Sequence, residues 1–352
     1  MTDTRIVKLD PENPDPAAIE EAGRILKDGG LVAFPTETVY GLGGDALNPH
    51  ASEKIYAAKG RPSDNPLIVH IADMEHLYPI AEEVPPKAVL LASKWWPGPL
   101  TMIFRKTELV PQETSGGLST VAVRMPKHPV ALSLIRAAGG YIAAPSANTS
   151  GRPSPTRAEH VAADLSGKID MILDGGEVRI GLESTIVDFT EDIPVILRPG
   201  YINKEMLEEI LGPVRIDPGI LKAGADGKIH PKAPGMRYRH YAPRASLTIV
   251  EGEKTAVIGR INELTKKAQA EKKKVGVIAA DETASMYCAE DVKDIGSRET
   301  DTTIARRLFA VLREFDEDGV DLIFSEAFNT PRMGQAIMNR LLKAAGHHII
   351  KV

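Results

Sequence analysis

The sequence contains a single cysteine, few aromatic residues and no apolar run long enough to cross a bilayer. Cys288 cannot form a disulfide within the chain, so a reducing compartment, the cytoplasm, is expected. The polar start MTDTRIVKLD lacks the apolar core of a signal peptide. We therefore expect a globular protein that is neither secreted nor attached to a membrane.

Several well-known catalytic and cofactor-binding motifs are also missing. There is no G-x-x-x-x-G-K-[ST] phosphate-binding loop, no H-E-x-x-H or C-x-x-C motif and no G-x-S-x-G nucleophile elbow. The stretch GLGGDA (41–46) resembles half of a dinucleotide-binding fingerprint, but it lacks the third glycine and the position that opens a helix. We therefore expect no built-in metal and no organic cofactor.

Neither sign of charge dominates, since the net charge is -5. Lys and Arg number 20 against 29 Asp and Glu in residues 1–211, 7 against 2 in residues 212–245, and 16 against 17 in residues 246–352. The middle segment is a small basic island, which suits either a nucleic acid or an anionic ligand. Charge alone does not distinguish these partners.

The length of 352 residues predicts two domains. In residues 1–211, helical patterns alternate with short apolar runs such as LVAFPT (31–36) and PLIVHIA (66–72). Apolar residues at consecutive positions are typical of strands that are covered on both faces. This part of the chain therefore predicts an α/β domain with a large, mixed sheet.

Residues 212–245 are rich in glycine and proline and show no sustained period, which predicts a linker. This linker contains an aromatic and basic cluster, GMRYRHYAP (235–243), that a plain spacer does not need. A second alternation of strands with helices at roughly 259–272, 302–316 and 332–346 fills residues 246–352. This predicts a smaller, doubly wound α/β domain.

Polar residues gather where the predicted strands of the first domain end. They are Thr36, Thr38, Lys59, Arg61, Ser63, Asn65, Thr120, Arg124, Ser146, Asn148, Ser150, Arg152, Ser154, Ser184 and Arg198. Ligands of open α/β sheets bind at strand ends, and a polyphosphate needs hydroxyl, amide and cationic donors. The set therefore favours a nucleotide site.

Each of these residues also has a purely structural interpretation. Lys59 followed by Gly60 is an ordinary helix end, and the serines can cap turns. His70 can be a core histidine, and Arg124 and Arg198 can form surface ion pairs. The functional interpretation depends on all of them occurring together.

The order and spacing of the motifs resemble the YrdC-like family. The motifs are FPTETVYGLGGDA (34–46), KGRPSDNPLIVHI (59–71), WPGPLTMIF (96–104), VAVRMPKHP (121–129), APSANTSGRPSPT (144–156), ESTIVDF (183–189) and ILRPG (196–200). With the linker and the second domain, the whole chain resembles the two-domain Sua5 branch. The resemblance implies a YrdC-like catalytic domain (1–211) with a large twisted sheet, a linker that closes over the active site (212–245) and a Rossmann-like domain (246–352).

The activity that the resemblance implies is L-threonylcarbamoyladenylate synthesis. ATP, L-threonine and bicarbonate become threonylcarbamoyl-AMP and pyrophosphate, with Mg²⁺ accompanying ATP. A separate transferase complex then modifies A37 of tRNAs that read ANN codons, so stable direct binding of tRNA is not expected. Such a transfer depends on alignment and charge neutralisation, which fits a site of cations and hydroxyls without an evident nucleophile.

The resemblance also implies roles for individual residues. The threonine site would consist of Thr36, His70, Arg124, Ala144 and Ser184. The ATP site would consist of Lys59, Arg61, Asn65, Thr120, Ser146, Asn148, Ser154, Arg198 and Tyr241, of which Lys59, Arg61, Ser146 and Asn148 would be catalytic. Ser146 and Asn148 are candidate contacts of the Mg²⁺ ion, whose ligands the sequence does not identify.

Two other functions remain open at this point. An RNA-binding module would explain the basic island, although the first domain is acidic and shows no basic-aromatic stripe. A carbamoyltransferase is the second alternative, although the zinc-finger-like and acylphosphatase-like segments of such enzymes are absent. A regulatory or docking role of the second domain is a third possibility, and it is compatible with the synthase activity that the resemblance implies.

Overall fold

The computed structural model describes residues 2–221, 233 and 241–352. Contacts divide the chain into two compact units. Of the described residues, unit 1 comprises 2–150, 154–179, 183–221 and 233, and unit 2 comprises 151–153, 180–182 and 241–352. None of the helices in the described ranges is long and apolar enough to span a membrane.

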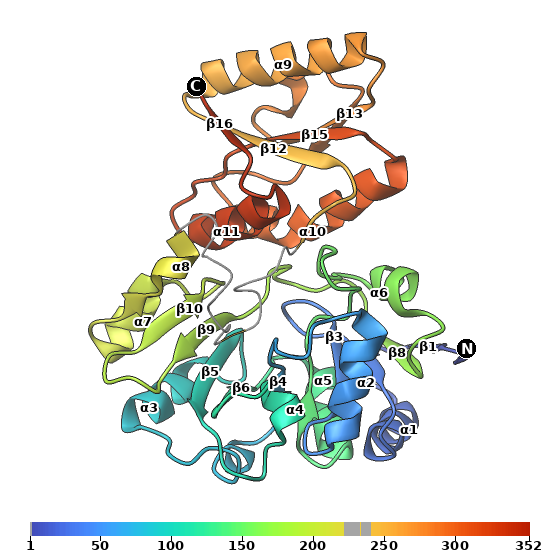
Figure 1. Cartoon of the computed structure of the whole chain (residues 1–352), viewed down its shortest axis with the longest axis vertical. Helices are drawn as coiled ribbons and strands as arrows, with labels where there is room; N and C mark the ends of the chain where they lie inside the picture. Colours follow the sequence, from blue (N-terminus) through green and yellow to red (C-terminus); the bar gives the residue numbers. More distant parts are fainter. Residues whose placement is uncertain (1, 222–232, 234–240) are drawn as a thin grey trace. The chain divides into compact units, whose positions relative to one another are not determined.

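Unit 1 is an α/β unit (Figure 1). Its elements are β1 (Arg5–Lys8), α1 (Pro16–Lys27), β2 (Val32–Phe34), β3 (Gly41–Asp45), α2 (Pro49–Lys59), β4 (Ile68–His70), η1 (Met74–His76), α3 (Pro86–Trp95), β5 (Leu100–Arg105), α4 (Gln112–Ser115), β6 (Thr120–Arg124), α5 (Pro129–Ala137), β7 (Ile142–Ala143), α6 (Ala158–Leu165), β8 (Met171–Asp174), β9 (Thr185–Asp188), β10 (Val195–Arg198), α7 (Lys204–Leu211), β11 (Arg215–Ile216) and α8 (Pro218–Leu221).

The described strands of unit 1 form one mixed sheet in the order β1-β8-β2-β3-β7-β4-β6-β5-β9-β10-β11. β4 pairs in parallel with β6 and antiparallel with β7, while β5 pairs antiparallel with β6 and in parallel with β9. The sheet therefore confirms the predicted large mixed sheet. β11 and α8 lie in the first part of the predicted linker, where β11 pairs with β10.

Local sequence signals account for the first helix. The Asp15 side chain accepts a hydrogen bond from Ala17 N, and Pro16 occupies the first helical turn, so α1 has a proper N-terminal cap. Its apolar face packs on α5 so closely that a Cβ at Gly23 would lie 2.7 Å from Cβ of Ala137. The glycine is therefore a packing requirement.

The glycine-rich stretch that resembled half a dinucleotide fingerprint is the strand β3. It pairs antiparallel with β2 and β7 in the middle of the sheet. A Cβ at Gly43 would lie 2.9 Å from Cγ2 of Ile142 and 3.0 Å from Cε1 of Phe34. The glycines allow the bulky side chains of neighbouring strands to pack directly on the β3 backbone. A glycine-rich sequence of this kind is more typical of a loop than of a strand, so the pattern alone did not predict β3.

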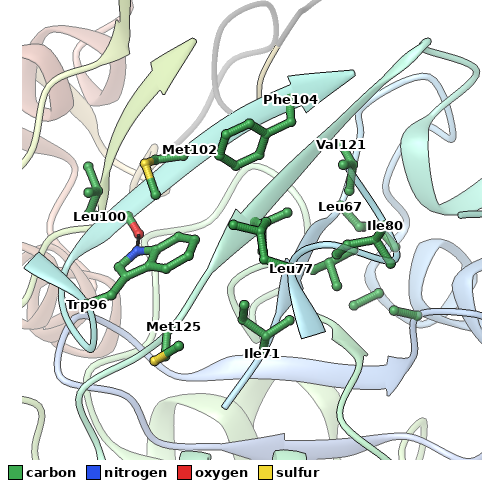
Figure 2. Packing of buried hydrophobic residues seen from close by; sticks show 14 of the residues in the cluster. Leu67, Ile71, Leu77, Ile80, Trp96, Leu100, Met102, Phe104, Val121 and Met125 are labelled. Carbon is green, nitrogen blue, oxygen red and sulfur yellow. Dashed lines mark hydrogen bonds between the residues drawn. The ribbon is translucent and has the colours of Figure 1, made fainter. Parts of the chain in front are cut away.

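A hydrophobic core packs against the strands that carry the candidate site. Figure 2 shows side chains that meet on one side of β5 and β6: Leu67, Ile71, Leu77, Ile80, Trp96, Leu100, Met102, Phe104, Val121 and Met125. The Trp96 indole also donates to Leu100 O at 2.8 Å. Burial of each large apolar side chain contributes roughly 1.5–3 kcal/mol, so the strand ends are fixed to a rigid body.

Unit 2 is a parallel doubly wound sheet in the order β14-β13-β15-β12-β16. Its elements are β12 (Ser246–Glu251), α9 (Lys254–Ala270), β13 (Val275–Ala279), η2 (Ala284–Met286), β14 (Asp291–Asp294), α10 (Asp301–Asp318), β15 (Leu322–Glu326), α11 (Gly334–Ala344) and β16 (Ile349–Lys351). α9 covers one face of the sheet, and α10 and α11 cover the other (Figure 1). The predicted smaller α/β domain is confirmed, while β14 was not predicted from its charged sequence.

Two short segments that precede the predicted linker belong to unit 2. Arg313, a buried residue of α10, donates through Nη2 to Pro153 O at 2.6 Å, and Ala242 N donates to Gly151 O at 2.9 Å. Residues 180–182 are the other segment, where a Cβ at Gly181 would lie 2.4 Å from Cα of Arg306. Unit 2 therefore includes part of the serine-rich motif 144–156.

Candidate active site

The loop between β2 and β3 forms a tight turn built by Thr36. Its hydroxyl donates to Val39 O at 2.7 Å and accepts from Thr38 N at 3.1 Å. Both threonines are buried, and their hydroxyl oxygens lie 2.9 Å apart. Between them stands Glu37, which is also buried, so the turn fixes a carboxylate inside the unit.

Glu37 faces Arg124, the last residue of β6. Arg124 Nη2 lies 2.9 Å from Glu37 Oε1, and both residues are at most 5% exposed. The distance is that of an ion pair, but the angles are not those of a hydrogen bond. Glu37 Oε1 and Oε2 and Arg124 Nε and Nη2 consequently have no hydrogen-bond partner. Buried polar atoms without partners are uncommon and costly, so this pair is poised for a ligand with groups of both charges.

His70 lies beside this pair, because it is the register partner of Arg124 in the parallel strands β4 and β6. Its Nδ1 lies 3.1 Å from Ile68 O, so the ring donates there and presents Nε2 as an acceptor. Burial, followed by the positive charge of Arg124, lowers the pKa of His70 to about 3. The imidazole is therefore neutral throughout the physiological range.

A row of hydrogen-bonded side chains begins next to Arg124, at Thr101, and continues across the sheet. Thr101 is the register partner of Arg124 on β5, and its hydroxyl lies 2.7 Å from that of Ser184. Arg198 donates through Nη2 to Ser184 Oγ and through Nε to Ser184 O, both at 3.0 Å. All of these residues are buried. The row connects the predicted threonine residues to Arg198, a predicted ATP residue.

Lys59 holds the serine-rich loop that follows β7. It is the last residue of α2, and Gly60 closes the helix in a left-handed conformation with φ 62°. The buried ammonium of Lys59 donates to Ser146 O at 2.5 Å and to Asn148 O, and its own carbonyl accepts from Ser150 N at 2.9 Å. Lys59 thus shapes this loop, and its predicted contact with phosphate stays a prediction.

Side chains within the loop are also ordered by one another. Ser146 Oγ donates to Asn148 Oδ1 at 2.6 Å, and Asn148 Nδ2 donates to Thr149 O at 2.9 Å. Ala144, at the start of the loop, donates through its backbone to Ile68 O at 2.9 Å. Because Ile68 O also faces His70, the loop runs directly from the predicted threonine residues to Lys59.

Arg61 and Asn65 form the other side of the motif 59–71. The Arg61 guanidinium donates to Asn65 O at 3.2 Å and to Pro66 O at 3.0 Å. Asn65 is buried, and its side-chain oxygen Oδ1 has no hydrogen-bond partner. That oxygen is a further buried polar atom that a ligand could satisfy.

Ser154 binds an acidic residue that the sequence analysis did not select. Its buried hydroxyl donates to Glu183 Oε1 at 2.5 Å. Glu37 and Thr101 were missed in the same way. All three lie inside the quoted motifs, and the signal that could have found them is an acidic or hydroxyl residue within an otherwise apolar, buried segment.

The remaining predicted residues lie at the start of β6 and in unit 2. Thr120 begins β6. Tyr241 belongs to unit 2, where its ring centroid lies 5.0 Å from that of Phe309 and its backbone adopts φ 65°. Arg152 also belongs to unit 2 and pairs with Asp316 at 3.4 Å.

The predicted lid, residues 212–245, is described at residues 212–221, at residue 233 and from residue 241 onwards, so its aromatic and basic cluster (235–243) lies mostly outside the described residues. Among residues 2–221, 233 and 241–352, no group of three or more His, Cys, Asp or Glu side chains is arranged to hold a metal ion.

Two family models match the chain. The model for Sua5, YciO and YrdC proteins, described as telomere recombination, matches residues 24–200. The model described as threonylcarbamoyl-AMP synthase, C-terminal domain, matches residues 202–346. Together they cover both parts of the chain.

Curated relatives share about half of the residues. A threonylcarbamoyl-AMP synthase of Pyrococcus abyssi is 52% identical over 334 residues, covering 95% of this chain and 96% of the relative. One of Bacillus subtilis is 50% identical, covering 95% and 94%. The solved structure of P. abyssi Sua5 complexed with L-threonine matches with a TM-score of 0.93 at 50% identity, covering 99% of this chain and 100% of that one. The resemblance seen in the sequence is confirmed, and the chain belongs to the Sua5/YrdC/YciO family.

Proposed function

We propose that the chain is an L-threonylcarbamoyladenylate synthase, which converts ATP, L-threonine and bicarbonate into threonylcarbamoyl-AMP and pyrophosphate. The names of its relatives support this activity. The observation that carries it in the structure is the buried pair of Glu37 and Arg124, whose side-chain atoms lack hydrogen bonds. An amino acid offers a carboxylate and an amino group to such a pair.

Threonine is proposed to bind at the end of β6. Its carboxylate would receive two parallel hydrogen bonds from Arg124, which lysine could not supply. Its amino group would donate to Glu37, and its hydroxyl would donate to His70 Nε2, because the neutral ring presents an acceptor there. Thr36, Ala144 and Ser184 would complete the pocket.

The reaction has two bond-forming steps. Dehydration of bicarbonate gives CO₂ and hydroxide, the neutral amine nitrogen adds to the carbon of CO₂, and the proton that it loses combines with the hydroxide to form water, which leaves a carbamate. A carbamate oxygen then attacks the α-phosphorus of ATP, and the bond to the bridging oxygen breaks so that pyrophosphate leaves. Mg²⁺ arrives with ATP as part of the substrate. Alignment and neutralisation of phosphate charge would supply most of the catalysis.

The nucleotide is proposed to lie along the loop after β7. Proximity to the threonine pocket supports this position, because the segment from Ala144 to Asn148 leads from Ile68 to Lys59. The proposed contacts are Lys59, Arg61, Asn65, Thr120, Ser146, Asn148, Ser154, Arg198 and Tyr241. Asn65 Oδ1, which lacks a partner, is suited to accept a donor from the base.

The composition of residues 230–244 supports a role as a lid that keeps water from the mixed anhydride product. Deletion of these residues should leave threonine binding intact and abolish adenylate formation. Unchanged turnover would contradict the role.

Downstream, a separate transferase complex would pass the threonylcarbamoyl group to A37 of tRNAs that read ANN codons. The single cysteine supports a cytoplasmic location.

Pyrophosphate release by the purified protein tests the activity. Release from ATP should require both L-threonine and bicarbonate, and mass spectrometry should detect threonylcarbamoyl-AMP in equal amount. Release without threonine would favour another acceptor of the carbamoyl group. Absence of release together with salt-dependent tRNA binding would favour an RNA-binding module instead.

A further inference from the structure

A cavity lies at the point in unit 2 where the sheet topology reverses. β12 and β15 are parallel neighbours, with Val250 opposite Glu326 at their carboxyl ends. The chain leaves β12 toward α9 on one face of the sheet and leaves β15 toward α11 on the other face (Figure 1). Ligands of doubly wound α/β folds bind in the crevice that such diverging connections create.

The cavity has a volume of about 310 Å³ and is lined by polar and apolar groups. Charged groups come from the end of β12 (Glu251), the start of α9 (Lys254), the loop before α10 (Arg298) and the end of β15 (Glu326). Val250, Val257 and Ala327 supply apolar contacts. This volume fits a ligand of amino-acid size.

The inner wall of the cavity is a rigid hydrogen-bonded cluster around Glu326. This carboxylate is only 2% exposed and accepts from Thr283, from the Tyr287 hydroxyl at 2.6 Å and from Arg298. Arg298 also donates to Ala327 O at 2.9 Å. The wall is therefore preorganised, which lowers the entropic cost of binding.

The groups that remain available on the lining include two cations. Arg298 carries five N–H groups, and its side chain is 38% exposed although it binds Glu326 and Ala327 O. Lys254 is exposed and forms no ion pair or hydrogen bond with any described residue. These groups suit a carboxylate.

One carboxylate on the lining is also accessible. Glu251 is 31% exposed, accepts from Asn329 at 2.9 Å and lies 3.7 Å from Lys351 Nζ. A positively charged group of the ligand could therefore bind to the Glu251 carboxylate. The formal charges of Glu251, Glu326, Lys254 and Arg298 cancel, so a zwitterion leaves the cavity neutral, whereas a phosphate dianion would give it a net negative charge beside two carboxylates.

We propose that this cavity binds a small α-amino acid, with its carboxylate on Arg298 and Lys254, its ammonium group on Glu251 and a short aliphatic side chain on Val257 and Ala327. The site lies entirely within unit 2 and is separate from the residues proposed for catalysis. It therefore does not depend on the proposed function of unit 1.

Methyl NMR of the full-length protein tests the proposal, because Val257 and Ala327 report on this cavity and Ala144 reports on unit 1. The probes are glycine, L-alanine, L-serine, L-threonine and L-valine, with succinate and inorganic phosphate as anions that lack an ammonium group. At least one amino acid should shift the Val257 and Ala327 signals saturably, and the two anions should not.

Matched lysine variants identify the binding group. Lys254→Gln should raise the dissociation constant at least about ten-fold, because a charge-assisted hydrogen bond is lost. Lys266→Gln changes an exposed lysine elsewhere on α9 and should leave the dissociation constant unchanged. Arg124→Gln should abolish shifts at Ala144 and leave those at Val257. Saturable shifts with phosphate but no amino acid, no saturable shift with any probe, or equal binding by Lys254→Gln would overturn the proposal.

Discussion

The two units place buried carboxylates at strand ends in opposite ways. In unit 1, Glu37 forms an ion pair with Arg124, yet both carboxylate oxygens lack hydrogen bonds. In unit 2, Glu326 is equally buried but accepts from two hydroxyls and a guanidinium. The first arrangement is complete only with a ligand, and the second is complete without one. The number of satisfied hydrogen bonds therefore separates a binding group from a structural group of the same chemical type.

Glu326→Ala should cause the largest loss of stability. The change leaves the hydroxyls of Thr283 and Tyr287 without an acceptor and Arg298 without its counter-ion, so the free energy of unfolding should fall by about 3 kcal/mol. Urea unfolding of the full chain measures this loss. Glu251→Ala, at the partly exposed carboxylate of the same cavity, is the control and should cost less than about 1 kcal/mol. Equal losses of unfolding free energy in the two variants would contradict the conclusion that the buried carboxylate is structural and the accessible one is not.

Arg124→Lys should reduce activity strongly with little effect on stability, because Nε and Nη2 of Arg124 make no hydrogen bond in the protein. We expect kcat/KM for threonine to fall by about 10²–10³-fold, since a lysine cannot make the paired hydrogen bonds to a carboxylate. Steady-state pyrophosphate release measures it. Arg136→Lys, at an exposed arginine paired with Asp73, serves as the control. A large loss of stability with normal kcat/KM would mean that Arg124 is structural, like Glu326.

Lys59→Ala should lower turnover by about 10²-fold, roughly 2–4 kcal/mol of transition-state stabilisation. The buried ammonium organises the loop through Ser146 O and Asn148 O, so KM for ATP should rise while the affinity for threonine stays normal. Arg61→Ala should act in the same direction. Lys54→Ala, on the same helix, is the control, and its ammonium binds Gly29 O instead. Near-normal turnover of Lys59→Ala would refute the assignment.

The pH dependence of stability should show the smallest effect. Burial lowers the pKa of His70 to about 3 from an ordinary value of 6.5, so the unfolded chain takes up a proton below pH 6.5 that the folded protein does not. The contribution of His70 to the free energy of unfolding is therefore fully present above pH 6.5. As the pH falls below 6.5, it decreases by about 1.4 kcal/mol per pH unit, which amounts to about 2 kcal/mol at pH 5. Unfolding of His70→Gln should lack this part of the slope, and the exposed His50→Gln should retain it. Identical slopes in the wild type and His70→Gln would show that the ring is protonated in the folded state.

Much of the site could be predicted from polar residues that lie next to apolar runs or at the end of a helix. Arg124 ends β6, as the sequence predicted, whereas Lys59 ends the helix α2 and Ser184 precedes β9 rather than following a strand. The mixed sheet and the second parallel sheet followed from the apolar patterns in the same way. Local sequence patterns were sufficient for features that depend only on residues close together in the sequence.

Other features depend on contacts between distant parts of the chain. The role of Glu37 could not be predicted without knowing that Arg124, at the end of β6, forms an ion pair with it. The role of Glu183 likewise depends on its hydrogen bond from Ser154. β3 was missed because its glycines resemble a loop, although their small size is what lets Ile142 pack across the strand. Such residues are selected by three-dimensional packing, which no local periodicity records.

The segments at residues 151–153 and 180–182 limit how this protein can be shortened by engineering. Removing everything after residue 237 would delete Arg313 and Ala242, which bind Pro153 O and Gly151 O. The orphaned carbonyls would then sit in the middle of the serine-rich motif. A minimal catalytic version of the chain therefore needs new loops at both segments, and a simple stop codon after the first unit would leave them without support.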